Sequence, residues 1–155
     1  EDIVGKHTPN YMRYCAYRRA LEEHNIPFDP HLVAQNMDSA YTSGYSTGFN
    51  CMKQLCTRNR DMTAVFAFAD ILAMGAAKAA FSMGYRVPDD ISIVGFDGIE
   101  AAEFYHPSID TIYQPANEMA LSSVEILLDM LQGAEAQHKV FEGVLLKRGS
   151  CKRIL

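Results

Sequence analysis

Apolar residues occur along this chain either as short continuous runs or as longer stretches with helical spacing. The short runs predict strands, which we place at residues 32–34, 64–68, 91–95, 109–113 and 140–146. The longer stretches predict helices at residues 9 to about 26, 42 to about 55, 70–83 and 115–133. Strands that alternate with helices are typical of a parallel sheet flanked by helices on both faces. The sequence therefore predicts an α/β fold.

Residues at the ends of the predicted helices support these boundaries. Thr8 can cap the first helix, and Pro9 occupies its first position, where no backbone donor is lost. Asp70 is expected to cap the helix that starts there, and Gly84 is expected to end it in a left-handed conformation. The capping residues therefore agree with the apolar periodicity.

The composition is typical of one soluble globular domain. The chain has 155 residues, of which 48% are hydrophobic and 21% charged, and its formal net charge is -5. An acidic surface does not attract nucleic acid, so DNA binding would need residues outside this sequence. No apolar run approaches the ~18 residues of a membrane span, and the first residues lack the apolar core of a signal peptide. We therefore expect a cytoplasmic protein that does not associate with membranes.

The start of the chain is unusual for a complete domain. Only Ile3 and Val4 precede Gly5 in the first strand-like segment, whereas a strand usually has ~5 to 6 residues. We therefore expect the chain to be part of a larger protein.

The residue types that bind metals or catalyse reactions show no recognisable spacing. The four cysteines form neither a CxxC pair nor a zinc pattern, and the histidines are not paired. Reduced thiols are the simplest interpretation, with Cys15 and Cys51 buried on helices. Phosphate loops and nucleophile elbows are also absent from the sequence. We expect no metal, no cofactor and no enzymatic activity.

Two longer segments resemble a known family. They are Thr63–Ala76 and Gly84–Asp97, and the second contains the string Val-Pro-Asp-Asp-Ile-Ser-Ile-Val-Gly-Phe-Asp. From about Gly5 to Arg148, the chain resembles the C-terminal part of the effector-binding domain of lactose-repressor/galactose-repressor (LacI/GalR) transcriptional regulators. The resemblance implies one lobe of a periplasmic-binding-protein-like (type I) fold, in which two α/β lobes hold a polar ligand between them.

The resemblance also implies a division of the chain. Residues 1–113 would form the C-terminal lobe, residues 114–137 a helix that crosses toward a missing N-terminal lobe, and residues 138–155 a return strand and tail. The function implied is a ligand-sensing and dimerisation module that binds a small polar effector such as a sugar. DNA would be bound only through a missing N-terminal helix-turn-helix, and the protein would be a homodimer.

Two other functions are compatible with the same fold. One is an extracytoplasmic sugar-binding protein, which an upstream signal peptide would identify. The other is a sensor domain joined to a different signalling output, because the tail at Arg148–Cys151 resembles the end of such sensor domains. The periplasmic-binding fold by itself does not decide among these functions.

Candidate ligand-binding residues lie beyond the carboxyl ends of the predicted strands, where open parallel sheets bind ligands. Asp97 follows the strand at 91–95, and its carboxylate could accept hydrogen bonds from ligand hydroxyl groups or cap the turn at 98–100. Arg13 lies early in the first helix, where it could be an ordinary surface residue. The resemblance implies that Arg13 and Asp97 both contact the ligand, and the planar guanidinium suits that task.

Three further residues are candidates with open alternatives. Gln114 precedes the predicted crossing helix, so it could contact ligand or tie the crossing strands together. Tyr41, near Ser39, follows the segment at 32–34. The resemblance implies an aromatic ring that stacks on the ligand there, whereas the local sequence also fits helix capping by Asp38 or Thr42.

Ala69 departs from the family pattern. Many members carry a polar, ligand-contacting residue at this position, which directly precedes the aspartate equivalent to Asp70. Alanine cannot make that contact, and Asp70 itself is expected to have a structural role.

Two helical surfaces suggest contacts with other elements. The alanine-rich helix between Ala73 and Ala80 permits close approach of its own sheet or, by the resemblance, of a second subunit together with residues 99–106, and both contacts can hold on different faces. The helix at 115–133 carries a stripe formed by Leu121, Val124, Leu128 and Leu131. We expect this stripe to pack against another lobe or chain.

Overall fold

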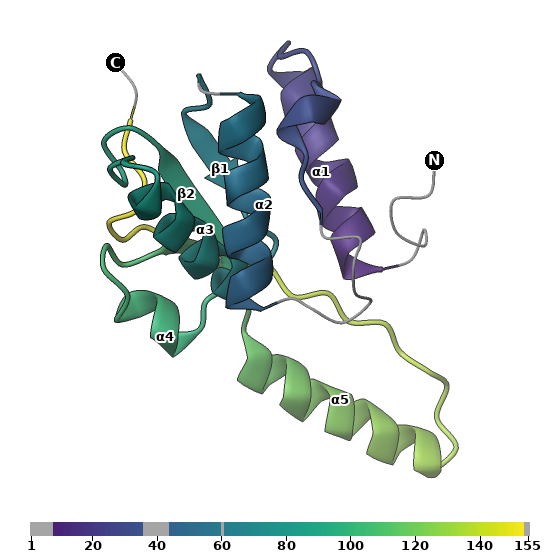
Figure 1. The fold of residues 1–155 in the computed structure, drawn as a ribbon. Helices are drawn as coiled ribbons and strands as arrows, with labels where there is room; N and C mark the ends of the chain where they lie inside the picture. Colours follow the sequence, from purple (N-terminus) through teal and green to yellow (C-terminus); the bar gives the residue numbers. More distant parts are fainter. Residues whose placement is uncertain (1–7, 36–43, 60, 154–155) are drawn as a thin grey trace.

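The computed structural model describes residues 8–35, 44–59 and 61–153, which form a four-stranded sheet with helices around it (Figure 1). The strands are β1 (Ala64–Phe66), β2 (Ser92–Asp97), β3 (Asp110–Tyr113) and β4 (Val144–Leu146), and they lie in that order across the sheet. β1, β2 and β3 are parallel, whereas β4 is antiparallel to β3. The predicted α/β fold with a parallel sheet is confirmed for β1, β2 and β3. The sequence did not indicate the direction of β4, which is antiparallel because the chain returns alongside β3.

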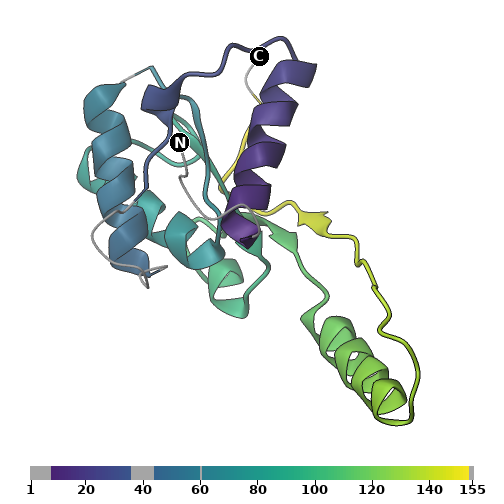
Figure 2. The same ribbon diagram turned by 90° about the vertical axis from the view of Figure 1, so that its right-hand side faces the viewer.

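Helices cover both faces of the sheet. The described residues form α1 (Pro9–Glu23), the short 3₁₀ helix η1 (Pro30–Leu32), α2 (Tyr45–Arg58), α3 (Asp70–Ser82), α4 (Glu100–Glu103) and α5 (Ala116–Leu131). Figure 2 shows α1 on one side of the strands and α2 and α3 on the other. This layering agrees with the arrangement predicted from the alternation of strands and helices.

Several predicted helix ends are confirmed. The Thr8 hydroxyl oxygen accepts a hydrogen bond from the Tyr11 backbone N–H at 3.3 Å, and Pro9 is the first residue of α1. Gly84, just beyond α3, and Gly133, just beyond α5, have φ angles of 85° and 94°. Glycine adopts these angles without the Cβ clash that other residues meet, which explains its place at both ends.

The strand predicted at residues 32–34 is wrong. The Asp29 carboxylate accepts from the His31 backbone N–H at 2.8 Å, and Pro30 starts the single turn η1. This local capping favours a 3₁₀ turn over an extended segment. The first strand-like segment, Ile3–Val4, lies outside the described residues.

The core lies between the sheet and the α2–α3 pair. Met52 of α2, Met74 and Ala77 of α3, and Ile93 of β2 are all buried in it. Helices α2 and α3 cross closely because Gly48 and Gly75 each face the backbone of the other helix. A Cβ at Gly75 would overlap the Tyr45 carbonyl oxygen. The small residues of α3 therefore pack against α2 and the sheet of the same chain, as one of the two alternatives predicted.

The cysteines are placed differently from the prediction. Cys15 is exposed and Cys51 is only half-buried, whereas Cys56 is buried. Cys15 lies on α1, a helix that buries none of its residues fully. Burial of Cys15 and Cys51 was therefore predicted wrongly.

The segment after β4 is tied to the start of β2 and β3. The Ile93 backbone N–H donates to the Ser150 carbonyl oxygen at 2.9 Å. The buried Asp110 carboxylate accepts from the backbone N–H groups of Ser150 at 2.8 Å and Cys151 at 3.2 Å. Residues 150–151 thus form part of the folded body rather than a loose tail.

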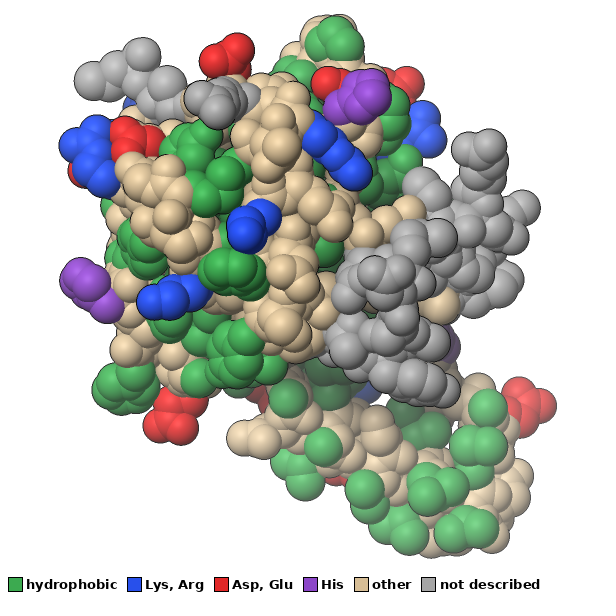
Figure 3. Space-filling view, viewed as in Figure 1, with side chains coloured by type: hydrophobic (Ala, Val, Ile, Leu, Met, Phe, Trp, Pro, Cys, Tyr) green, Lys and Arg blue, Asp and Glu red, His purple; other side chains and the backbone are tan. Residues whose placement is uncertain are grey.

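Helix α5 projects away from this body (Figures 1 and 2). Its predicted stripe is exposed: the exposed fractions range from 52% at Leu128 to 76% at Leu131. Figure 3 shows hydrophobic side chains spread over this helix. Among the described residues, no helix combines the length and apolar character needed to cross a membrane.

Candidate functional site

The carboxyl ends of the parallel strands bring three predicted site residues together. Asp97 is the last residue of β2, and Gln114 directly follows the neighbouring strand β3. Arg13 approaches them from the first turns of α1, with its Nη2 atom 3.9 Å from Asp97 Oδ1. The placement of Arg13 and Asp97 at one edge of the sheet, which the sequence predicted, is confirmed.

Besides its approach to Asp97, Arg13 makes two contacts that hold its guanidinium. Its Nη1 donates to the Phe68 carbonyl oxygen at 2.8 Å, and its guanidinium carbon lies 3.9 Å from the centre of the Phe96 ring. The guanidinium therefore stacks on an aromatic face, which orients its plane and favours its charge. Its side chain is 20% exposed, whereas that of Arg19, further along α1, is 76% exposed. Arg13 is thus not an ordinary surface arginine.

Asp97 has an unusual backbone conformation. Its φ angle is 119°, a value that side-chain-bearing residues seldom adopt. The Gln114 side-chain amide donates to Asp97 Oδ1 at 2.7 Å, and the Gln114 backbone N–H donates to the Asp97 carbonyl oxygen at 3.1 Å. The alternative role, capping of the turn at 98–100, belongs to another residue, because the N–H groups of Gly98 and Ile99 donate to Asp70.

The environment of Asp97 disfavours its charged form. Burial raises the pKa of this carboxyl, while the Arg13 charge and the Gln114 hydrogen bond lower it and the Asp70 charge raises it further. The net shift is upward, so the nearby donors compensate only part of the desolvation. A ligand that donates hydrogen bonds to this carboxylate would favour its charged form.

Asp70 does not cap α3 as predicted. Ala69 is the N-cap residue of α3, and no side chain caps this end. The Asp70 side chain is instead completely buried and accepts hydrogen bonds from residues beyond β2 and within β3. Its structural role is confirmed, but its bonds are long-range rather than local.

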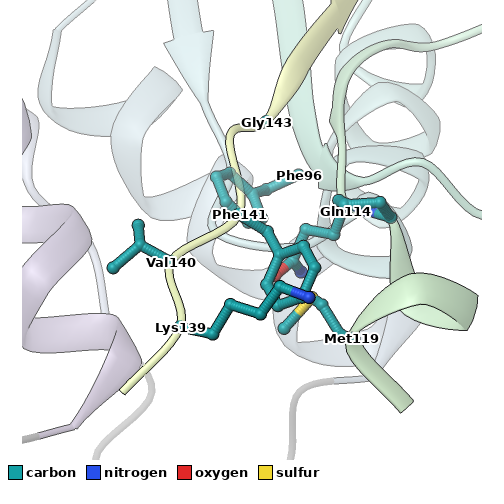
Figure 4. Close-up of a pocket in the computed structure, with 8 residues that line it drawn as sticks. Phe96, Gln114, Met119, Lys139, Val140, Phe141 and Gly143 are labelled. Carbon is teal, nitrogen blue, oxygen red and sulfur yellow. The ribbon is translucent and has the colours of Figure 1, made fainter. Parts of the chain in front are cut away.

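An apolar cavity adjoins the polar group. Its volume is about 270 Å³, and it is lined by Phe96, Gln114, Pro115, Met119, Lys139, Val140, Phe141 and Gly143. Figure 4 shows Lys139 and Met119 close to the Phe141 ring. The Lys139 ammonium donates to the Ser122 hydroxyl oxygen at 2.6 Å and lies 5.2 Å from the centre of the Phe141 ring.

Phe96 and Gln114 belong to both parts of the site. Phe96 supports Arg13 and also lines the cavity, and Gln114 bonds to Asp97 and also lines the cavity. The arrangement offers hydrogen-bonding groups beside aromatic surface, which suits a small ligand that has both polar edges and apolar faces.

Tyr41 and Ser39 lie outside the described residues, so their proposed contacts stay predictions. Within the described ranges, no three histidine, cysteine or acidic side chains are grouped so that they could hold a metal ion. Phe96 was missed as a site residue. Its alternation along β2 places it on the sheet face opposite the buried Ile93, but only the fold brings Arg13 over its ring.

The sequence matches the family of periplasmic binding protein-like domains over residues 3–151. It is 40% identical over 146 residues to the HTH-type transcriptional regulator MalR of Clostridium butyricum, covering 94% of this chain but 42% of that protein. An HTH-type transcriptional repressor PurR from Yersinia pestis is 40% identical over 119 residues, covering 77% of this chain and 33% of the repressor. The chain thus spans less than half the length of these curated relatives.

Solved structures agree with the sequence match. A complex of the transcriptional regulator CelR with cellobiose has a TM-score of 0.81 and 31% identity, over 89% of this chain and 41% of that one. A LacI family transcriptional regulator from Enterococcus faecium with bound ribose has a TM-score of 0.79 and 28% identity, over 92% of this chain and 52% of that one. These relatives are transcriptional regulators, and none of them is named as an enzyme.

Proposed function

We propose that this chain, which belongs to the periplasmic binding protein-like domain family, senses a sugar for a transcriptional regulator. The chain is akin to the effector-binding domains of LacI-family regulators. The observation that carries the proposal is the grouping of Arg13, Asp97 and Gln114 beside the cavity. Cellobiose and ribose in the related structures support a sugar over other polar metabolites.

The chemistry of the site suits a sugar ring. The Asp97 carboxylate can accept hydrogen bonds from hydroxyl groups, and Arg13 can donate to sugar oxygens with N–H groups not directed at Phe68. The faces of a sugar ring carry C–H groups, which pack well on aromatic rings such as Phe141. Ala69 offers no hydroxyl contact, so selectivity among sugars would depend on the other residues.

The sensing mechanism we propose needs a second lobe. Helix α5 leaves the body directly after Gln114, and residues 132–143 return beside it (Figure 2). We propose that the exposed apolar stripe of α5 packs against that lobe, so that a sugar at the edge of the sheet is enclosed from both sides. The ligand would shift the angle between the lobes only if it binds the closed state more tightly.

The output would lie outside these residues. The relatives are HTH-type regulators roughly twice the length of this chain or more, which favours a DNA-binding segment and a homodimer over a transport function. A sensor joined to another signalling module remains the alternative proposal. Footprinting of the natural protein on its own promoter region, with and without sugar, would distinguish the two.

Calorimetry tests the proposed site directly. The natural protein, with whatever chain flanks these 155 residues, is titrated with cellobiose and with ribose. Loss of a hydrogen bond to a charged group costs about 1.5–3 kcal/mol, so Arg13→Ala and Asp97→Ala are each expected to weaken binding about tenfold to a hundredfold.

Arg19→Ala serves as the matched control, because Arg19 lies on the same helix and pairs with Glu23 at its exposed surface. It is expected to leave the affinity unchanged. Unchanged affinity in both site variants would refute the assignment of these residues to the sugar site.

A further inference from the structure

Asp70 is the most completely buried charged residue among those described, with an exposed fraction of 0%. One of its oxygens, Oδ2, accepts from the backbone N–H groups of Gly98 and Ile99, both at 2.8 Å. The other, Oδ1, accepts from the Thr111 hydroxyl at 2.5 Å. The side chain therefore joins the start of α3 to the loop after β2 and to β3.

The loop held in this way begins directly after Asp97. Asp97 has a φ angle of 119°, a conformation that is strained in a residue with a side chain. A strained residue keeps its conformation only where neighbouring bonds impose it. Gln114 binds the Asp97 carbonyl oxygen, and Asp70 binds the next two N–H groups, so the backbone is fixed on both sides.

The packing around Asp70 leaves little room for another arrangement. A Cβ at Gly95 of β2 would overlap Asp70 Oδ1, and a Cβ at Gly98 would lie 2.7 Å from a ring atom of Tyr113. The glycines at these two positions let β2 and its following loop approach the carboxylate and β3. The same approach places the Asp97 carboxylate beside Arg13 and Gln114.

We propose that Asp70 is a positioning residue for the effector site: its buried carboxylate holds the Gly98–Ile99 backbone and so keeps Asp97 in the conformation that directs its side chain to the ligand. The second half of this proposal rests on the proposed function. The first half concerns the loop alone and can be tested without any ligand.

The ligand-free test compares glycine and alanine at position 97. At a φ angle of 119°, we expect Asp97→Gly to have an unfolding equilibrium constant about tenfold smaller than Asp97→Ala. In an ordinary extended loop the order reverses, and alanine is favoured about threefold because glycine loses more chain entropy. The preference for glycine therefore reports whether the backbone at position 97 is still held.

The comparison is repeated in two backgrounds. In Asp70→Ala, both bonds to the loop are lost, and we expect the preference for glycine to disappear or reverse. In Thr111→Val, only the bond to Oδ1 is lost, and we expect the tenfold preference to persist despite the lower stability. A preference of about tenfold that survives in Asp70→Ala overturns the proposal.

A measurement on the unmodified protein covers the case in which Asp70→Ala does not fold. Amide hydrogen exchange of Gly98 and Ile99 is expected to be at least about a thousandfold slower than in an unstructured chain, because both groups donate to a buried carboxylate. Exchange within about tenfold of the unstructured rate would show that Asp70 does not hold them, which also overturns the proposal.

A double-mutant cycle in cellobiose affinity tests the link to the ligand. If Asp70 acts through Asp97, Asp70→Ala and Asp97→Ala together weaken binding no more than about twofold beyond the stronger single variant. If the two losses multiply, Asp70 does not act through Asp97, and the link is refuted. If neither cellobiose nor ribose binds at all, the proposed function fails, while the glycine comparison still decides whether Asp70 positions the loop.

Discussion

Helices α3 and α5 are both rich in apolar residues, yet they lie in opposite environments. Eight of the 13 residues of α3 are buried, whereas Ser122 is the single buried residue among the 16 of α5. Helix α3 packs against α2 and β2, and α5 extends from the body with its leucine stripe exposed. An apolar stripe therefore shows that a helix needs a partner, but it does not show whether that partner belongs to the same chain segment.

The two helices also differ in the size of their apolar side chains. On α3, small side chains permit close contact with α2, so each position has little tolerance for change. On α5, large side chains are mostly exposed, with exposed fractions of 66% at Leu121 and 76% at Leu131. Exposed apolar surface of this kind usually marks a contact with another protein segment.

The largest expected effect comes from truncating one long side chain on each helix. Met74→Ala on α3 is expected to lower the free energy of unfolding by about 3 kcal/mol, because Met74 is only 3% exposed and its removal leaves a cavity. Leu128→Ala on α5 is expected to change it by less than about 0.5 kcal/mol in the 155-residue chain. Urea unfolding followed by circular dichroism measures both.

The same pair of variants can show that α5 is not more exposed than α3 in solution. If Leu128→Ala lowers the stability of the chain by more than about 1 kcal/mol, the stripe is covered in solution. Sedimentation of the unmodified chain would then show whether a second copy covers it.

The next effect concerns the crossing of α2 and α3. Gly75→Ala adds one methyl group that would overlap the Tyr45 carbonyl oxygen, so the helices must separate. We expect a loss of about 2 kcal/mol in the free energy of unfolding. Gly44→Ala is the matched control, because a Cβ there meets no atom within 4 Å and its φ angle is -102°. Equal losses from the two variants would show that close packing at Gly75 contributes nothing.

The smallest effect lies at the exposed edge of the body, where Arg86 binds Asp90. Hydrogen bonds from the Arg86 side chain and backbone N–H lower the pKa of Asp90 from 3.8 to about 2. A carboxyl whose pKa falls on folding stabilises the protein above pH 3.8, and this contribution is lost as the pH falls toward 2.

Asp90→Asn is therefore expected to flatten the pH dependence of stability between about pH 4 and pH 2. Carbon-13 NMR titration provides the direct measurement, and Arg86→Gln should return the pKa of Asp90 toward 3.8. A pKa that does not move in Arg86→Gln would contradict this account.

Local signals in the sequence were sufficient to predict most helices. They also predicted that the site lies at the carboxyl ends of the parallel strands. The Thr8 cap and Gly84 stop were predicted correctly because their hydrogen bonds and backbone angles depend on residues within a few positions. Arg13 and Asp97 were predicted to share an edge because parallel strands place their carboxyl ends together.

Contacts between distant residues could not be predicted in this way. Asp70 had the local pattern of a helix cap, but its partners are 28, 29 and 41 residues away. Residues 32–34 are apolar enough for a strand, yet the Asp29 and Pro30 turn before them gives η1 instead. The partner of Arg13, the ring of Phe96, also became evident only in the folded chain.

Residue types and short-range spacing were enough to predict the α/β pattern, the family resemblance and the polar residues that follow the strands. The antiparallel direction of β4, the burial of Asp70 and the aromatic support of Arg13 became evident only in the folded chain. These features arise from the packing of segments far apart in the chain, where the free energy depends on which surfaces meet rather than on any one segment.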